Sequence, residues 1–281
     1  MTPTLAVIAA GMMGSGVAGR LTQHRVPVLT SLAGRSAASV ARAEAAGMTD
    51  ASDAEIAQVE IILSIVPPGD ALALAERLAP HLTAVHRKPA YVDCNAVNPA
   101  TVARIAAVIE ATGARFVDGG IIGGPPAPGS IGTSIYVSGP YAPDIAVLND
   151  YGLEIRVLNS AVGAASALKM SYAGITKGFT ALGAAMMLAA TRGGAAEDLR
   201  RELAASQPAL YGWLSRQTPK MYSKAYRWVA EMQEISGFTG DDEAAGKIFD
   251  GCAEFYQRIA NDFAAEGRET GAIDDFLKPR N

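Results

Sequence analysis

The spacing of hydrophobic and polar residues changes near residue 160. Before that point, short apolar runs alternate with segments whose apolar residues recur at helical spacing. The runs that predict buried strands cover residues 5–8, 26–32, 59–66, 90–93 and 115–118, with closing strands at 134–138 and 154–158. The helical segments cover residues 37–46 and about 70–82, and a third follows Asn98, a candidate N-cap. Alternating strands and helices predict an α/β fold with a parallel, doubly wound sheet.

A different pattern follows. Residues 163–191 form one helix-like run, rich in alanine and glycine, in which only Lys169 and Lys177 are charged. Such a helix must be covered by other helices or by a second subunit, so we expect a homodimer. From residue 193 no strand is evident. We therefore expect two domains, a sheet domain over residues 1–162 and, over 163–281, a long inter-domain helix with an all-α C-terminal domain.

The first predicted strand ends in a glycine turn. Gly11 and Gly14 interrupt the apolar run, and small and apolar residues compatible with a helix follow. A strand, a glycine turn and a helix form the first unit of a dinucleotide-binding Rossmann domain, in which the helix N-terminus binds the pyrophosphate. The usual G-x-G-x-x-G pattern begins here with Ala9, and a tight turn in another kind of α/β protein is the alternative. The predicted cofactor-binding residues of this turn are Gly11, Met12, Met13 and Gly14.

The end of the second strand bears on the choice of cofactor. An NAD-binding unit places Asp or Glu there for the ribose 2′-hydroxyl, but no acidic residue occurs between Gly11 and Glu44. Arg35 and Ser36 stand at this turn instead, a guanidinium and a hydroxyl that suit a 2′-phosphate. A solvated surface arginine is the alternative reading. We predict NADP (NADPH) as the cofactor.

Other strand ends should line the same crevice. Val66, Pro67 and Asn95 follow two of the predicted strands, and ligands of open α/β sheets bind outside the carboxyl ends of the strands. Lys169, near the start of the long helix, can close this crevice. Desolvation would lower the pKa of an isolated lysine in an apolar helix, which suits a general acid or base. A lysine that extends to solvent is the alternative.

Net charge and composition limit the kinds of partner and the compartment that we expect. The net charge of −4 does not suggest nucleic acid, and the longest uncharged part of the long helix, residues 178–191, is shorter than a membrane span. Cys94 and Cys252 fit a reducing compartment, so we expect a cytoplasmic protein. The three histidines lack metal-ligand spacing, so no metal site is expected.

Several of these segments together resemble the β-hydroxyacid dehydrogenase family, whose architecture 6-phosphogluconate dehydrogenase shares. The segments are Gly11-Met12-Met13-Gly14, Val66-Pro67, Asp93-Cys94-Asn95, the loop 118–124 and the run 163–169 ending in Lys169. The resemblance covers the whole chain, and residues 226–235 are more similar to a poorly characterised 6-phosphogluconate-dehydrogenase-like branch. It implies hydride transfer between a nicotinamide and a hydroxyl-bearing carbon of a small-molecule substrate, with Lys169 as the catalytic proton-transfer group.

The chain departs from the family pattern at the substrate site. Ile122 stands where the family has a serine for the substrate carboxylate, although Gly123 and Gly124 keep their backbone donors. Ala173 replaces the usual asparagine four residues after the lysine, with Tyr172 beside it, and the C-terminal Lys-Asp motif is missing. These five residues are the predicted substrate-binding set. A bulkier or less acidic substrate than a small β-hydroxy acid is therefore expected.

The sequence favours an NADP-dependent alcohol–carbonyl oxidoreductase. An imine reductase of the same family is the alternative, although that group usually carries Asp or Tyr where Lys169 stands. A decarboxylating sugar-phosphate dehydrogenase would need a cluster of basic residues that the Ile122 loop lacks. A protein that binds NADPH without turnover is a further alternative, suggested by Ala9, Ile122 and Ala173.

Overall fold

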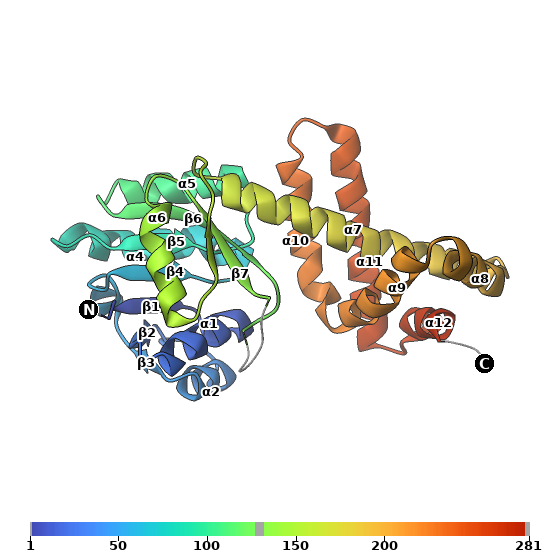
Figure 1. The fold of residues 1–281 in the computed structure, drawn as a ribbon, viewed down its shortest axis with the longest axis horizontal. Coiled ribbons are helices and arrows are strands. Elements are labelled where there is room, and N and C mark those ends of the chain that lie inside the picture. Colours follow the sequence, from blue (N-terminus) through green and yellow to red (C-terminus); the bar gives the residue numbers. More distant parts are fainter. Residues whose placement is uncertain (1, 127–131, 279–281) are drawn as a thin grey trace. The chain divides into compact units, whose positions relative to one another are not determined.

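The computed structural model describes residues 2–126 and 132–278. These residues form two compact units, of which the first ends at Lys169 and the second begins at Met170 (Figure 1). The domain boundary predicted from the sequence, between residues 162 and 163, falls just before the long helix that enters the second unit.

The described residues of the first unit form an eight-stranded sheet. Its strands are β1 (Leu5–Ile8), β2 (Val28–Thr30), β3 (Met48–Asp50), β4 (Ile61–Ser64), β5 (Ala90–Asp93), β6 (Arg115–Ile122), β7 (Ser134–Ser138) and β8 (Ile155–Val157). Their order in the sheet is β3-β2-β1-β4-β5-β6-β7-β8, and each neighbouring pair is parallel except β6 and β7. The predicted Rossmann-type sheet is therefore confirmed.

Three details differ from the prediction. The strand β3 was missed because it is three residues long and buries only Met48, which leaves no readable periodicity. β6 continues to Ile122 through residues predicted as loop, and β7 pairs with it in antiparallel register, Gly120 opposite Tyr136. Glycine weakens a strand signal in sequence, but here Gly120 of β6 allows a helix to lie close to the sheet.

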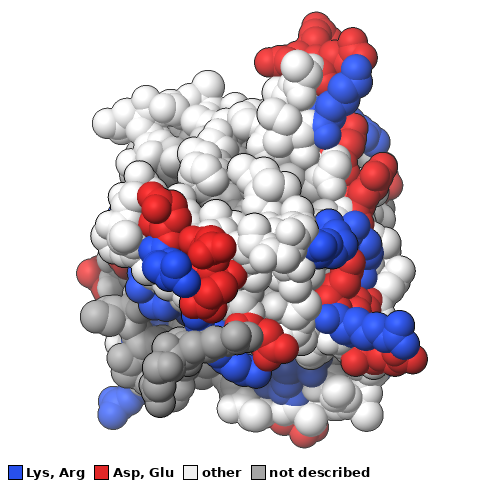
Figure 2. All heavy atoms as spheres, turned by 90° about the vertical axis from the view of Figure 1, so that its right-hand side faces the viewer, with Lys and Arg blue, Asp and Glu red and all other residues white. Residues whose placement is uncertain are grey.

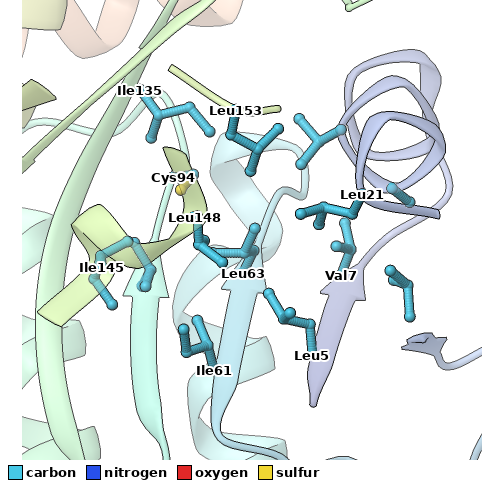
Figure 3. Packing of buried hydrophobic residues seen from close by; sticks show 14 of the residues in the cluster. Leu5, Val7, Leu21, Ile61, Leu63, Cys94, Ile135, Ile145, Leu148 and Leu153 are labelled. Carbon is cyan, nitrogen blue, oxygen red and sulfur yellow. The ribbon is translucent and has the colours of Figure 1, made fainter. Parts of the chain in front are cut away.

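Helices cover both faces of the sheet (Figure 1). One face carries α1 (Met12–Gln23), α2 (Ala37–Ala45) and α6 (Ala142–Ile145), and the other carries α3 (Asp53–Ile56), α4 (Ala71–Ala84) and α5 (Pro99–Glu110). In Figure 3, Leu21 of α1 lies beside Val7, and Leu148, three residues after the end of α6, lies beside Leu63. Burial of such side chains stabilises the fold by roughly 1.5–3 kcal/mol each.

The second unit is helical in its described part. It contains most of α7 (Ala164–Arg192), followed by α8 (Ala196–Ser206), α9 (Pro208–Gln217), α10 (Ala225–Phe238), α11 (Glu243–Ala264) and α12 (Arg268–Leu277). Glycines of α7 make room for its neighbours: a Cβ on Gly183 would lie 2.5 Å from Leu214 of α9, and one on Gly174 would lie 3.1 Å from Phe249 of α11. Tyr256 of α11 donates a hydrogen bond to the carbonyl oxygen of Lys177 at 2.6 Å. The prediction of helices packed around one long helix is confirmed.

One side of α7 remains uncovered. Ile175, Phe179, Leu182 and Met186 recur at helical spacing and are each more than half exposed. By length and composition α7 could cross a membrane, with a mean hydropathy of 1.3 in an 18-residue window of which 39% is buried. Core helices of soluble proteins meet the same criteria, so this is a weak indication of a membrane segment. On the face shown in Figure 2, charged side chains gather along two margins and leave uncharged surface between them.

Candidate active site

The turn after β1 contains two glycines with different roles. A Cβ on Gly14 would lie 1.9 Å from the carbonyl oxygen of Ala9, so only glycine lets α1 pack this closely against the strand end. Gly11 is the N-cap of α1, and a Cβ there would meet no described atom within 4 Å. No described side chain caps this helix, and its first turn carries no acidic residue. The open, uncapped N–H groups fit the pyrophosphate of a dinucleotide.

The two methionines of the turn differ in exposure. Met12 is 58% exposed beside Gly11, whereas Met13 is half-buried and packs against the core under α1. Of the two predicted contacts, Met12 therefore has the more accessible side chain.

The turn after β2 carries the predicted ribose-recognition residues. Ser36 is the N-cap of α2, and its Oγ accepts a hydrogen bond from the backbone N–H of Ser39 at 3.4 Å. Arg35 precedes it and is half-buried. The hydroxyl of Ser36 thus lies at the positive end of α2, and the neighbouring residue, Arg35, carries a guanidinium group. Both groups suit a phosphate.

Two charged residues beside these turns were missed from the sequence. Asp50, the last residue of β3, accepts a hydrogen bond from the backbone N–H of Leu32 at 2.8 Å, which brings a carboxylate to the end of β2. Arg42 of α2 donates from Nε to the carbonyl oxygen of Ala10 at 3.0 Å, next to the glycine turn. Asp50 reaches this place through the pairing of β3 with β2, and no local signal in the sequence shows that pairing.

Asn95 connects the ends of β4 and β5. Its side chain is 3% exposed, with Oδ1 accepting a hydrogen bond from the backbone N–H of Val66 at 2.7 Å. Its Nδ2 donates to Ser64 Oγ at 2.8 Å and also to the carboxylate of Asp93. The amide thus bonds to protein groups and orders the strand end at Val66 and the exposed Pro67. A direct contact of Asn95 with a cofactor stays a prediction.

Asp93 is a buried carboxyl group with incomplete hydrogen bonding. Its side chain is 1% exposed, and Oδ2 has no hydrogen-bond partner among the described residues. Burial raises the pKa of Asp93 to about 7, and the nearby carboxylate of Asp118 adds to that rise against the lowering effect of the Asn95 N–H. A buried carboxyl group with this pKa exchanges its proton near neutral pH.

Asp118 of β6 holds the start of α7. It is fully buried, and its Oδ2 accepts hydrogen bonds from the backbone N–H groups of Gly163 and Ala165, both at 2.9 Å, and of Ser166 at 3.2 Å. Ser138 Oγ donates to the same oxygen at 2.8 Å, and Ser166 Oγ donates to Oδ1 at 2.6 Å. These bonds satisfy N–H groups that a helix start leaves without intrahelical partners.

Lys169 lies against the same strand. A Cβ on Gly120 would lie 2.7 Å from the carbonyl oxygen of Ala165 and 3.1 Å from the Cβ of Lys169, so α7 packs directly on the backbone of β6. Lys169 is half-buried. Ile122, two residues after Gly120, is the half-buried end of β6, and Gly123 follows with a φ of 121°. The structure therefore brings Lys169 close to the strand that leads into the predicted substrate loop, including the exposed Gly124.

The two predicted substrate residues that follow Lys169 belong to the second unit and differ in exposure. Tyr172 is 49% exposed, whereas Ala173 is buried at 2%. Within residues 2–126 and 132–278, no group of three or more His, Cys, Asp or Glu side chains could hold a metal ion.

Residues 4–143 match the NAD binding domain of 6-phosphogluconate dehydrogenase, and residues 190–259 match a domain of unknown function (DUF1932). An uncharacterised 28.5 kDa protein of Methanothermus fervidus is 31% identical over 178 residues, a match that spans 61% of this chain and 66% of that protein. The chain thus covers slightly less than two thirds of that relative's length.

Two solved structures extend the comparison to nearly the whole chain. A conserved protein of unknown function, described as structurally similar to 3-hydroxyacid dehydrogenases, is 30% identical with a TM-score of 0.71, covering 91% of this chain and 99% of that one. The 3-hydroxyisobutyrate dehydrogenase of Mycobacterium tuberculosis, solved with L-serine, is 18% identical with a TM-score of 0.69, covering 98% and 99%. The second likeness shows a shared fold.

The resemblance inferred from the sequence motifs is therefore confirmed. The match to the cofactor domain falls on the part of the chain that contains the uncapped glycine turn and the strand ends beside it. Together with the helical second unit, these findings show that the chain belongs to the β-hydroxyacid dehydrogenase family of NAD(P)-dependent dehydrogenases and reductases.

Proposed function

We propose that this protein is an NADP-dependent oxidoreductase that interconverts a hydroxyl-bearing carbon and a carbonyl in a small organic substrate, with Lys169 moving the proton. The position of Lys169 carries the proposal. A Cβ on Gly120 would lie 3.1 Å from the Cβ of Lys169, so the lysine packs on β6 near the carboxyl end of that strand. Open α/β sheets bind their ligands outside the carboxyl ends of the strands. A lysine there is half-buried and positioned by packing, which suits proton transfer.

Lys169 acts as a base in one direction of the reaction and as an acid in the other. A bound nicotinamide supplies the hydride acceptor or donor. In the oxidation direction, neutral Lys169 takes the proton of the substrate hydroxyl as the carbon loses a hydride. In the reduction direction, protonated Lys169 gives its proton to the carbonyl oxygen. Ile122 has no hydroxyl to hydrogen-bond a substrate carboxylate, which favours a bulkier or less acidic substrate.

The preference for NADP over NAD rests on the turn after β2. Arg35 and the Ser36 cap suit a 2′-phosphate, and Arg42 adds a second guanidinium near the glycine turn. Asp50 opposes this preference, because a carboxylate at the end of β2 would repel a phosphate and accept a hydrogen bond from a ribose hydroxyl. Two guanidinium groups against one carboxylate favour NADP.

The test is a panel of alcohols, hydroxy acids, aldehydes and imines, followed by the absorbance of NADPH. Lys169→Met should lower kcat on the best substrate by at least about 10²-fold and change NADPH affinity by only a few-fold. The exposed Lys247 of α11 supplies the matched control, since Lys247→Met removes a lysine from the surface. Retention of more than about a tenth of kcat in Lys169→Met would refute the role of this lysine, with Tyr172 the next candidate.

Two other results would replace the proposal. Turnover restricted to imines would make the protein an imine reductase. NADPH binding without turnover of any panel member would make it a non-catalytic binding protein.

We also propose that the protein works as a cytoplasmic homodimer. The uncovered apolar side of α7, with Ile248 of α11, borders a groove of about 760 Å³, and a second copy would bury this surface. Cys94 and Cys252 are unpaired, which suits a reducing compartment. The mild net charge of −4 gives no reason to include nucleic acid or a membrane among the partners.

A further inference from the structure

The start of α7 is attached to the sheet mainly through one carboxylate, and Ser138 Oγ of β7 also accepts the N–H of Ala165 at 3.1 Å. Asp118 accepts hydrogen bonds from the first N–H groups of α7 and from the hydroxyl of Ser166, all within a fully buried site. A negative charge at this end also interacts favourably with the helix dipole. Asp118 therefore fixes the position of the first helical turn along and above β6.

The same strand fixes the rotation of the helix. Asp118 and Gly120 are two residues apart on β6, so they face the same side of the sheet. Asp118 accepts a hydrogen bond from Ser166, and Gly120 packs against Lys169. Lys169 follows Ser166 by three residues, so both lie on the same side of α7. A hydrogen-bonded anchor and a close packing contact on one strand thus define where Lys169 stands.

We propose that Asp118 and Ser166 are positioning residues for Lys169. Neither is assigned a contact with substrate or cofactor: they act by holding the first turns of α7 in place, and so they set the location of the Lys169 side chain. This inference rests on the proposed proton-transfer role of Lys169. Loss of the anchor should therefore lower kcat and leave NADPH affinity nearly unchanged, because a misplacement of about 1 Å can cost a reaction about 10²-fold.

Ser166→Ala is the variant of choice. It removes the 2.6 Å bond to Asp118 and leaves the backbone bonds in place, so folding should survive, whereas Asp118→Asn would set an amide against several donors. Thr180→Ala is the matched control, since it removes a buried hydroxyl of the same helix that bonds to the carbonyl oxygen of Thr176 at 2.9 Å. Ser166→Ala should lower kcat by about tenfold with NADPH affinity within about threefold, and Thr180→Ala should change neither.

A double-mutant cycle separates positioning from general damage. In the Lys169→Met background, Ser166→Ala should cause no further loss of kcat, because its effect passes through the lysine. An equal loss in both backgrounds, or no loss in the wild type, would overturn the inference.

A second measurement needs no substrate. Acetylation of Lys169 by a short pulse of acetic anhydride, followed by peptide mass spectrometry, reports the surroundings of its amine. Ser166→Ala should change this rate by about threefold or more relative to wild type, and Thr180→Ala should not. If Lys169→Met remains active, the proposed function fails, and the acetylation rate still decides whether Ser166 positions the lysine: an unchanged rate refutes it.

Discussion

Replacing Asp93 with asparagine should flatten the pH dependence of folding stability between pH 5 and pH 8. Burial holds the pKa of Asp93 at about 7 in the folded protein, against about 3.9 for an aspartate in an unfolded chain. The folded state therefore binds this proton more tightly than the unfolded state does. The resulting stabilisation is fully present below pH 3.9 and is lost as the pH rises through 7.

The size of the effect follows from these two pKa values. From pH 5 to pH 8, the wild type should lose about 2.5 kcal/mol of unfolding free energy through Asp93. Asparagine does not titrate, keeps the shape, and retains an oxygen that can accept the hydrogen bonds of Asn95. Its amide nitrogen can take the place of Oδ2, which has no partner among the described residues. Other titrating groups are common to both proteins, so their contributions cancel in the difference.

The assay must report on the first unit. Trp213 and Trp228 both belong to the second unit, so tryptophan fluorescence would not follow unfolding around Asp93. Urea unfolding followed by far-UV circular dichroism at pH 5, 6, 7 and 8 gives the stabilities, and amide exchange in β5 peptides identifies the transition of the sheet. A difference between wild type and Asp93→Asn that stays constant over this range would refute the reasoning.

Three further predictions concern the cofactor site and the apolar side of α7. Arg35→Ala should reduce the preference for NADPH over NADH by roughly ten- to a hundredfold, and Asp50→Asn should strengthen NADPH binding. Isothermal titration measures both changes, and tighter binding of NADH than of NADPH by the wild type would contradict the NADP proposal. Gly14→Ala should weaken NADPH binding and lower the unfolding free energy of the first unit by about 1–3 kcal/mol, because the new Cβ would overlap the Ala9 carbonyl. Urea unfolding measures the stability, and wild-type values of both affinity and stability would show that the turn adjusts freely. Leu182→Glu should convert a dimer into a 29.1 kDa monomer in light scattering, and a wild type already at that mass would rule out the dimer.

Much of the first unit could be predicted because its strands are buried runs with clear ends. The strand 134–138 was predicted with its observed bounds, and Asn98 caps α5 by accepting the N–H of Thr101 at 3.0 Å, as expected from a capping residue before proline. These signals are local, since each depends on residues a few positions apart. The glycine turn belongs to the same class, because Gly11, the N-cap of α1, and Gly14, in the first turn of that helix, follow β1 within a few residues.

The parts that were missed depend on contacts between distant residues. Asp50 reaches the end of β2 only because β3 pairs there, and three residues with one buried side chain leave no pattern. The hydrogen bonds of Asn95 to Val66 and Ser64 are tertiary too, so its place at a strand end did not reveal them, and its contact with a cofactor stays a prediction. Asp118 begins the predicted loop 118–124, but the sequence of this loop does not indicate which groups bond to the Asp118 carboxylate.

The anchor at Asp118 also determines where this chain can be divided. Its bonds to α7 join residues 45 to 48 positions apart, so the first turn of that helix becomes stable only after β6 has formed. A fragment that begins at residue 163 would carry this turn without its partner, and its end should fray. A fragment that begins at Met170 omits those groups and leaves the first unit with its own helical turn in place. Separate expression of the two halves should therefore favour a division inside the helix over a division at the loop before it.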